Sequence, residues 1–269
     1  MPVEYFKTHA IQTGAFTPEA FFYSSGTTDQ TRSVHPIKSL ETYHRTALEG
    51  FQLHYGHPKD MAILGLLPSY LDNPNASLVS MVGHFIAHSN YQASGFFMNN
   101  LKQLARTLED LEARQVPTLL IGVSFALLDL AERYPMPLHH TMVMETGGMK
   151  GRRKEMVRQE LHSILKEAFN LPVVHSEYGM TELLSQAYAT KDGRFQPPPW
   201  MKVLVRDPYD PFHVTESGRG ALNIIDLANR HTCAFLATQD LGTVHSDGSF
   251  EVSGRFDHAD IRGCNLMVL

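Results

Sequence analysis

The amino-acid sequence predicts an α/β protein whose last third is rich in β-strands. Apolar strand-like segments alternate with amphipathic helix-like segments in the first part of the chain, as in folds that pack helices on a sheet. In the last third, strand-like segments follow one another closely and glycine-containing turns separate them. The chain has 269 residues, of which 43% are hydrophobic, so it can build a substantial core.

Local signals justify the elements of the first part in order. Ser39 stands where a helix over 39–55 needs its N-cap. Pro68 ends an apolar run at 61–67, which is typical of a buried strand. The helix over 99–115 carries leucines at spacings of three and four along one face. The full set of predicted elements comprises strands at 20–24, 61–67, 118–123, 141–145 and 173–176, and helices at 39–55, 76–88, 99–115, 125–133 and 152–169.

The last third is expected to form strands joined by tight turns. Asp247 and Gly248 make a pair that is typical of a two-residue hairpin loop. Three prolines within 196–200 predict an extended loop instead of a strand. The expected strands lie at 201–205, 221–225 and 233–238.

Charge and composition exclude several classes of function. The formal net charge is −5 and no basic stripe occurs, so nucleic acid is not an expected partner. No apolar run approaches the ~20 residues of a membrane-spanning helix. Cys233 and Cys264 are too few for a disulfide framework, so we expect a cytoplasmic location.

The loop over residues 24–33 is the first candidate ligand site. Its first five positions contain four hydroxyl residues and a glycine, and an arginine follows: Ser24, Ser25, Gly26, Thr27, Thr28 and Arg32. Backbone N–H groups, short hydroxyls and a cation suit phosphate oxygens. The ending of a Walker A loop is absent, and a solvent-exposed turn can have the same composition.

Three further segments carry groups suited to a nucleotide. In 177–182, Tyr178 can stack on a purine, Thr181 can reach a phosphate and Glu182 can hold Mg²⁺. The glycines at 147 and 148 let a flat ring approach the backbone closely. Near the end of the chain, a carboxylate at 240 and a guanidinium at 255 can bind a ribose diol. Each pattern alone also fits an ordinary turn or surface pair.

Taken in order, these motifs closely resemble those of the adenylate-forming superfamily, which includes acyl-CoA synthetases, luciferases and peptide-synthetase adenylation domains. The loop at 24–33 resembles that family's phosphate loop, 178–182 matches Tyr-Gly-x-Thr-Glu, and 240–257 resembles the run that ends in Gly-Arg-x-Asp. The resemblance implies the large N-terminal-type domain of these enzymes over 1–254, with α/β layers followed by a β-rich section and no C-terminal lid domain.

Two segments sharpen this resemblance. Residues 145–153 and 254–267 are similar to the acyl-protein synthetases of bacterial luminescence, the long-chain-fatty-acid–luciferin-component ligases. In that family a cysteine close to the C-terminus takes the acyl group from the adenylate as a thioester. Cys264, in a short tail over 255–269, is the matching residue. Its alternative interpretation is a small apolar residue that packs a terminal strand.

The resemblance implies an AMP-forming acid–thiol ligase that uses ATP and Mg²⁺ to activate a carboxylic acid, by analogy a fatty acid. Thr181 would contact the α-phosphate and Glu182 would position Mg²⁺. The acyl group would pass to Cys264, to CoA or to a partner protein. The expected nucleotide contacts are Ser24, Ser25, Gly26, Thr27, Thr28 and Arg32 with phosphates, Gly147, Gly148, Tyr178 and Gly179 around the adenine, and Asp240 and Arg255 with the ribose.

Departures from the family pattern leave an alternative open. Asp29 and Thr31 replace the glycine and proline of the phosphate loop, and the catalytic lysine of the superfamily belongs to the lid domain. Only 23 residues precede the loop, where relatives carry more. A degenerate relative that binds nucleotide or acyl groups without independent catalysis also fits these features.

A serine hydrolase is the second alternative. Ser124 lies between a predicted strand and a predicted helix in a Gly-x-Ser-x-Ala sequence, which approximates a nucleophile elbow. Asp226 and His245 would complete its triad. A metal site at His84 and His88 is weaker still, because the glutamate of the zinc-peptidase motif is missing.

Overall fold

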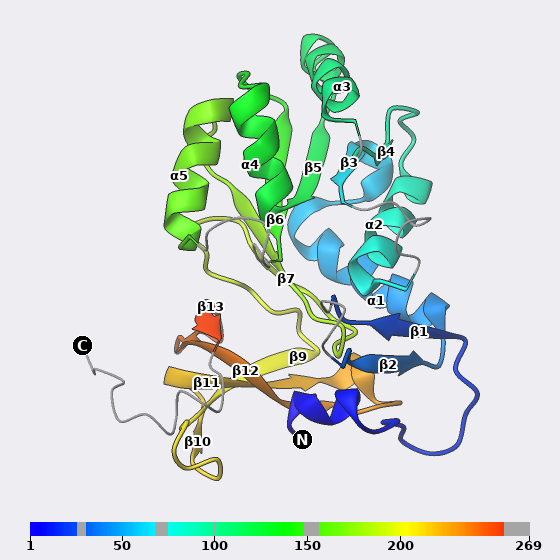
Figure 1. The fold of residues 1–269 in the computed structure, drawn as a ribbon, viewed down its shortest axis with the longest axis vertical. Helices are drawn as coiled ribbons and strands as arrows, with labels where there is room; N and C mark the ends of the chain where they lie inside the picture. The colour runs from blue at the N-terminus through cyan, green and yellow to red at the C-terminus, as the bar shows by residue number, and fades with distance from the viewer. Residues whose placement is uncertain (26–30, 68–74, 99, 148–155, 256–269) are drawn as a thin grey trace.

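The centre of the molecule is a six-stranded sheet, ordered β4-β3-β5-β6-β7-β8 (Figure 1). The computed structural model describes residues 1–25, 31–67, 75–98, 100–147 and 156–255. Five neighbouring strands run parallel, and β8 pairs antiparallel with β7. The strands are β3 (Ala62–Leu66), β4 (Gly95–Phe96), β5 (Thr118–Val123), β6 (Thr141–Thr146), β7 (His175–Tyr178) and β8 (Ala187–Ala189).

Helices cover both faces of this sheet (Figure 1). One face carries α1 (Leu40–Tyr55) and α2 (Ser77–His88), and the other carries α3 (Leu101–Ala113), α4 (Ser124–Arg133) and α5 (Arg158–Phe169). Successive side chains of a strand point to opposite faces. In β3, Ile63 therefore packs with α1 and α2, whereas Leu64 packs with the other three helices. Because both faces are buried, the central strands β3 and β5 are mainly apolar.

A second sheet, antiparallel and ordered β10-β9-β11-β12-β13, follows in the chain. Its strands are β9 (Met201–Arg206), β10 (Val214–Thr215), β11 (Gly218–Asp226), β12 (Phe235–Val244) and β13 (Phe250–Arg255). A shared core joins it to the first sheet, because Tyr178 and Leu183 pack with Phe195 and Phe250. The end of β7 therefore lies against the second sheet.

Short elements complete the part of the chain that the structure describes. They are the antiparallel pair β1 (Ala20–Tyr23) and β2 (Val34–Ile37), and the 3₁₀ helices η1 (Val3–Lys7), η2 (Pro58–Asp60) and η3 (Leu227–Asn229). The amino group of Met1 donates a hydrogen bond to the carbonyl of Phe235 at 2.9 Å, so η1 packs beside β12. Across the described residues, every helix is too short or too polar to cross a membrane.

The predicted fold class is confirmed by this arrangement. The Ser39 hydroxyl caps α1 by accepting the N–H of Thr42 at 3.2 Å. The predicted hairpin at Asp247–Gly248 joins β12 to β13 through a loop over 245–249, in which Gly248 has a φ of 82° and the His245 N–H donates to the Ser249 carbonyl at 2.8 Å. Most other predicted elements occur with ends shifted by a few residues.

The predicted boundaries differ most at α5, at β7 and at β12, which ends at Val244 instead of 238, and five strands (β2, β4, β8, β10 and β13) have no predicted range. The helix expected over 152–169 begins at Arg158, because Val157 has extended backbone; residues 152–155 lie outside the described ranges. The strand expected over 173–176 is β7, which pairing with β6 and β8 extends to Tyr178. β2, β4, β8 and β10 are only two to four residues long, and their pairing partners define them.

Candidate active site

Groups from both sheets meet where β7 ends. The hydroxyl of Tyr178, the last residue of β7, donates to Oδ2 of Asp240 at 2.7 Å. Nε of Arg255 lies 3.4 Å from Oδ1 of the same carboxylate. Asp240 and Arg255 are direct partners in the β12–β13 ladder, so the sheet itself places them side by side. Phenol, carboxylate and guanidinium therefore form one cluster.

The ring of Tyr178 is fixed within the shared core. Its centroid lies 5.7 Å from that of Phe195 and 5.2 Å from that of Phe250, and the residue is 8% exposed. Burial, followed by the negative charge of Asp240, raises the pKa of Tyr178 well above its usual value. The phenol therefore stays protonated and remains the donor to Asp240, while the guanidinium of Arg255 is half exposed.

Glu182 lies close to this cluster. It is 6% exposed, and burial raises the pKa of its carboxyl group against the opposing effects of the Ser33 side chain and the Arg255 charge. The Asp240 carboxylate adds to the increase. Thr181, which precedes Glu182, is partly exposed. A carboxyl group held among other oxygens, with its ionised form disfavoured, fits a site that a divalent cation would complete.

The loop over residues 24–33 connects β1 to β2 and is closed at its base. The N–H of Ser24 donates to the carbonyl of Ser33 at 3.1 Å, and the N–H of Ser33 donates to Oγ of Ser24 at 2.9 Å. Ser33 is also the residue whose side chain affects Glu182, so the base of the loop lies beside that carboxylate. Ser25 and Arg32 are exposed. Gly26, Thr27 and Thr28 lie outside the described residues.

The glycine turn after β6 is a separate part of the predicted site. Gly147 has a φ of 70°, and its carbonyl accepts the Ser124 hydroxyl at 2.8 Å. Gly179 is exposed directly after Tyr178. Gly148 and Cys264 lie outside the described residues. The structure thus brings together Ser24, Tyr178, Glu182, Asp240 and Arg255, and places Gly147 at the end of the strand next to β7.

Two buried carboxylic acids beside this turn have no role in the sequence prediction. Glu145 on β6 accepts a hydrogen bond from Nε of Arg158 at 3.0 Å and lies 3.6 Å from Nε2 of His162. Burial opposes its ionisation, but these partners together lower the pKa of Glu145. Glu177 on β7 accepts a hydrogen bond from the Thr146 hydroxyl. Burial raises the pKa of Glu177 to about 7.

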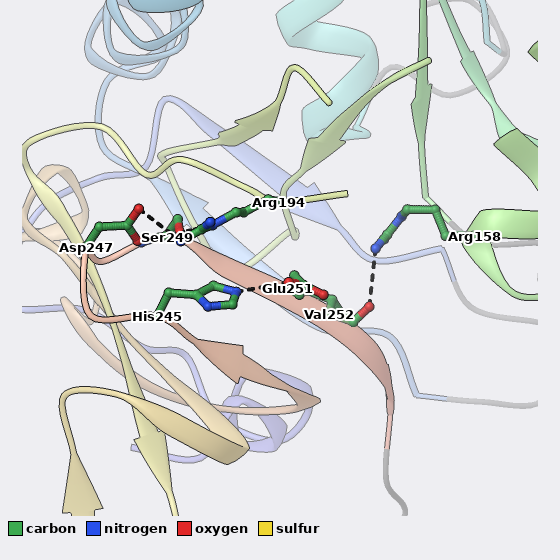
Figure 2. Close-up of polar contacts among 7 residues, drawn as sticks. All are labelled: Arg158, Arg194, His245, Asp247, Ser249, Glu251 and Val252. Carbon is green, nitrogen blue, oxygen red and sulfur yellow. Dashed lines mark hydrogen bonds and ion pairs between the residues drawn. The ribbon is translucent and has the colours of Figure 1, made fainter. Parts of the chain in front are cut away.

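Arg158 also connects the two halves of the molecule. Its guanidinium donates to the carbonyl of Val252 on β13 at 3.2 Å, as Figure 2 shows, and lies over the ring of Phe195 at 5.1 Å. β13 is held at its other end by Arg194, which binds Ser249 and Asp247 (Figure 2). These contacts fix the strand that carries Arg255.

The groups behind Glu182 were not predicted as part of the site. His35 and Asn229 bind the backbone of Thr181 and Glu182, and Asp226 binds the residues that follow. Neither His35 nor Asn229 belongs to a recognisable motif, and both are distant in sequence from Tyr178. Neither residue type signals such a role in the sequence, because buried polar residues also occur in ordinary cores.

The structure does not assemble the hydrolase triad. Ser124 begins α4 after β5, as an elbow would, but it is 3% exposed and its hydroxyl is bound to Gly147. The Asp226 carboxylate accepts hydrogen bonds from Leu184 and Ser185. His245 binds Glu251 at 2.9 Å on the β12–β13 hairpin (Figure 2).

The histidine pair on α2 does not form a metal site either. The rings of His84 and His44 stack at 4.4 Å with planes 12° apart, and the His88 ring lies 4.1 Å from His84. Nδ1 of His88 donates to the carbonyl of His84 at 2.8 Å, so it is not directed at a metal. Among the residues that the structure describes, no three histidine, cysteine or acidic side chains converge to hold a metal.

Comparison with solved structures shows that the fold is shared with a Coenzyme A synthetase and a luciferase-like enzyme, among others. MatB from Rhodopseudomonas palustris matches with a TM-score of 0.64 and 16% identity over 90% of this chain and 49% of that chain. O-succinylbenzoate Coenzyme A Synthetase (MenE) from Bacillus subtilis, solved with ATP and magnesium, gives 0.61 and 18% over 91% and 51%. The luciferase-like enzyme of the mealworm Zophobas morio gives 0.59 and 16% over 91% and 60%.

The likeness lies in the fold and not in close sequence similarity. No protein-family model matches the sequence, and no curated protein matches it at a significant level. The chain spans about half the length of MatB and of MenE.

Proposed function

We propose that this protein uses ATP to activate a carboxylic acid as an acyl-adenylate and then passes the acyl group to a thiol. The observation that carries the proposal is the cluster at the end of β7, where Tyr178, Asp240 and Arg255 adjoin Glu182 and the closed base of the 24–33 loop. A carboxylate and a guanidinium can bind a ribose diol, a second carboxylate can hold a cation, and a loop rich in hydroxyls can hold a polyphosphate. Here these groups lie close together. The likeness in fold to ligases that were solved with ATP supports it.

Each group has a role in the proposed reaction. Asp240 would accept hydrogen bonds from the ribose hydroxyls, beside the Tyr178 hydroxyl and the Arg255 guanidinium that already contact its carboxylate. The loop over 24–33 would hold the phosphates, with the exposed Arg32 as the cation. Gly147 and Gly179 would lie along the adenine.

The carboxylate of Glu182 would hold Mg²⁺ together with phosphate oxygens, since Mg²⁺ in nucleotide sites commonly takes one or two carboxylates. The cation would neutralise charge on the phosphates. The acid's carboxylate oxygen attacks the α-phosphorus, the bond to the β-phosphate breaks, and pyrophosphate leaves. The contribution of the protein is positioning and charge neutralisation.

In the second half-reaction a thiolate attacks the acyl carbon, the bond to the phosphate oxygen breaks, and AMP leaves. Cys264 is the proposed acceptor, and CoA or a partner protein are the alternatives. A fatty acid is the proposed substrate by its resemblance to the acyl-protein synthetases.

Pyrophosphate release tests this function. The purified chain is incubated with Mg²⁺-ATP and a panel of carboxylic acids, and we expect release that depends on one class of acid. Glu182→Ala should abolish it, whereas Glu216→Ala, which removes an exposed carboxylate between β10 and β11, should not. Intact mass measured on the same sample should show an acyl adduct that Cys264→Ala removes.

The outcomes separate the alternatives. ATP binding without pyrophosphate release for any acid would favour the degenerate nucleotide-binding protein. No ATP binding at all would reject the proposed activity for this chain.

A further inference from the structure

The turn that carries Thr181 and Glu182 is held from behind by three buried side chains. They are His35 of β2, Asp226 at the end of β11 and Asn229 of η3, and their exposed fractions are 0%, 0% and 1%. None of them has a role in the proposed chemistry. All three bind the main chain of the turn, so their function concerns its conformation.

Two of these side chains bind the peptide groups on either side of the Glu182 Cα atom. Nδ1 of His35 donates to the carbonyl of Thr181 at 2.7 Å, and Nδ2 of Asn229 donates to the carbonyl of Glu182 at 2.7 Å. A carbonyl group only accepts, so Nδ1 of His35 carries a proton. Burial lowers the pKa of His35 to about 4, so the ring is neutral at neutral pH.

The two donors are themselves held in place. The Thr232 hydroxyl donates to Oδ1 of Asn229 and lies 2.9 Å from Nε2 of His35. Nδ2 of Asn229 also donates to the carbonyl of Cys233 at 3.1 Å, which fixes the orientation of its amide. The ring of Phe6 meets the His35 ring edge-on at 5.3 Å. The donors are therefore fixed before any ligand binds.

The turn is anchored again just beyond Glu182. Oδ2 of Asp226 accepts the N–H groups of Leu184 and Ser185, each at 2.9 Å, and Oδ1 accepts the Ser185 hydroxyl at 2.6 Å. Nε1 of Trp200 donates to the same hydroxyl oxygen at 2.9 Å. The backbone is thus bound by side chains both at and after the Thr181–Glu182 pair.

We propose that His35 and Asn229 are positioning residues of the active site, which set the direction of the Glu182 side chain. The two peptide planes around a Cα atom determine the direction of its Cα–Cβ bond, and each plane at Glu182 is fixed by one donor. This inference rests on the proposed function, because it takes Glu182 to act on the cation and phosphates. A displacement of about 1 Å in a catalytic group can cost about 100-fold in rate.

The test compares variants of the full chain in acid-dependent pyrophosphate release. His35→Leu and Asn229→Ala remove one donor each, and His35→Asn keeps an N–H near the position of Nδ1. His231→Leu is the matched control, because this partly exposed histidine contacts Phe16 and not the turn. Turnover is divided by the amplitude of the adenylate burst, so that loss of folded protein is not counted as loss of rate.

We expect kcat per active site to fall about 10- to 100-fold in His35→Leu and Asn229→Ala. His35→Asn should recover most of the lost turnover. Amide hydrogen exchange in the peptide over 180–186 should become faster in the two variants, while exchange elsewhere stays unchanged. Unchanged kcat per active site, or a His35→Asn variant as slow as His35→Leu, would overturn the inference.

The wild-type chain alone tests the proposed function, whereas the comparison of variants with wild type tests the positioning role. If wild type binds ATP without turnover, the Mg²⁺-dependent part of its ATP affinity becomes the readout, and we expect Asn229→Ala to weaken it about 10-fold. Equal affinities would reject the positioning role. A wild-type chain that binds no ATP would reject both proposals.

Discussion

Buried carboxylic acids occur in both halves of the molecule, and within each half two of them differ in their partners. In the α/β half, Glu145 and Glu177 lie near the ends of the adjacent strands β6 and β7. In the antiparallel half, Asp226 and Asp240 lie on β11 and β12. Their exposed fractions are 4%, 7%, 0% and 7%, so burial does not distinguish them.

Their partners do distinguish them. Glu145 has a guanidinium and an imidazole beside it and its pKa is lowered, whereas Glu177 has one hydroxyl and its pKa is raised to about 7. Asp226 is bound by N–H groups and a hydroxyl of the protein's own turns. Asp240 has a half-exposed guanidinium beside it. Asp226 is thus bound by groups of the fold alone, whereas Asp240, beside an exposed guanidinium, is where we propose that a ligand binds.

The largest expected effect is that of Asp226→Ala. The substitution leaves the N–H groups of Leu184 and Ser185 without their buried acceptor, and the free energy of unfolding should fall by about 3–5 kcal/mol. Urea denaturation at pH 7 measures it. Asp247→Ala on the exposed hairpin serves as the control and should change stability far less. A loss below about 1 kcal/mol for Asp226→Ala would contradict its structural role.

The next effect is a pH dependence caused by Glu177. Its pKa is about 7 in the folded protein and ordinarily 4.5, so the folded state retains a proton that the unfolded state loses between these values. The resulting stability is fully present below pH 4.5 and is lost as the pH rises through 7, on the order of 3 kcal/mol in total.

Glu177→Gln should remove this loss, because an amide keeps the hydrogen bond from Thr146 and does not titrate. Urea denaturation of both proteins from pH 4 to pH 8 gives the comparison, with the exposed Glu160→Gln as control. Parallel pH profiles for wild type and Glu177→Gln would show that Glu177 is ionised when folded.

The smallest effect expected is that of Arg158→Ala, compared with Arg194→Ala. Arg158 forms an ion pair with the buried Glu145, whereas Arg194 forms one with the exposed Asp247 (Figure 2). At pH 7, Arg158→Ala should cost about 2 kcal/mol, because hydrogen bonds to a buried charge are stronger than those at the surface. Arg194→Ala should cost less.

The pH dependence of the Arg158 effect has the opposite sign to that of Glu177. The pKa of Glu145 is lowered in the folded state, so the stability that it contributes is present above its ordinary pKa and is lost as the pH falls. The difference between wild type and Arg158→Ala should therefore shrink in acid. Equal losses for the two arginine variants at pH 7 would show that burial of the partner does not matter here.

Much of the fold could be predicted because its signals are local. A capping serine and a leucine stripe define α1 and α3 within their own residues. β8 and β10 could not be found in this way, because strands of two or three residues exist only through their partners. The start of α5 was missed because charged residues before Arg158 are compatible with a helix.

The same contrast between local signals and contacts of distant residues applies to the candidate site. Tyr178 and Glu182 belong to one short motif, and Asp240 and Arg255 to another, so the sequence predicts them and the structure brings them together. His35 and Asn229 act on the main chain, which accepts a hydrogen bond from many side chains. No residue type at either position signals such a contact in advance.

The hydrogen bond from Asn229 to Glu182 links residues that are 47 positions apart. A ribosome adds about 5–20 residues per second, so the motif leaves the translation machinery about 2–9 s before the side chain that fixes it. The residues of every parallel strand of the first sheet have been synthesised before that interval begins. The geometry around Glu182 is thus completed late in synthesis, when the second sheet forms, and the nascent first sheet alone does not hold it.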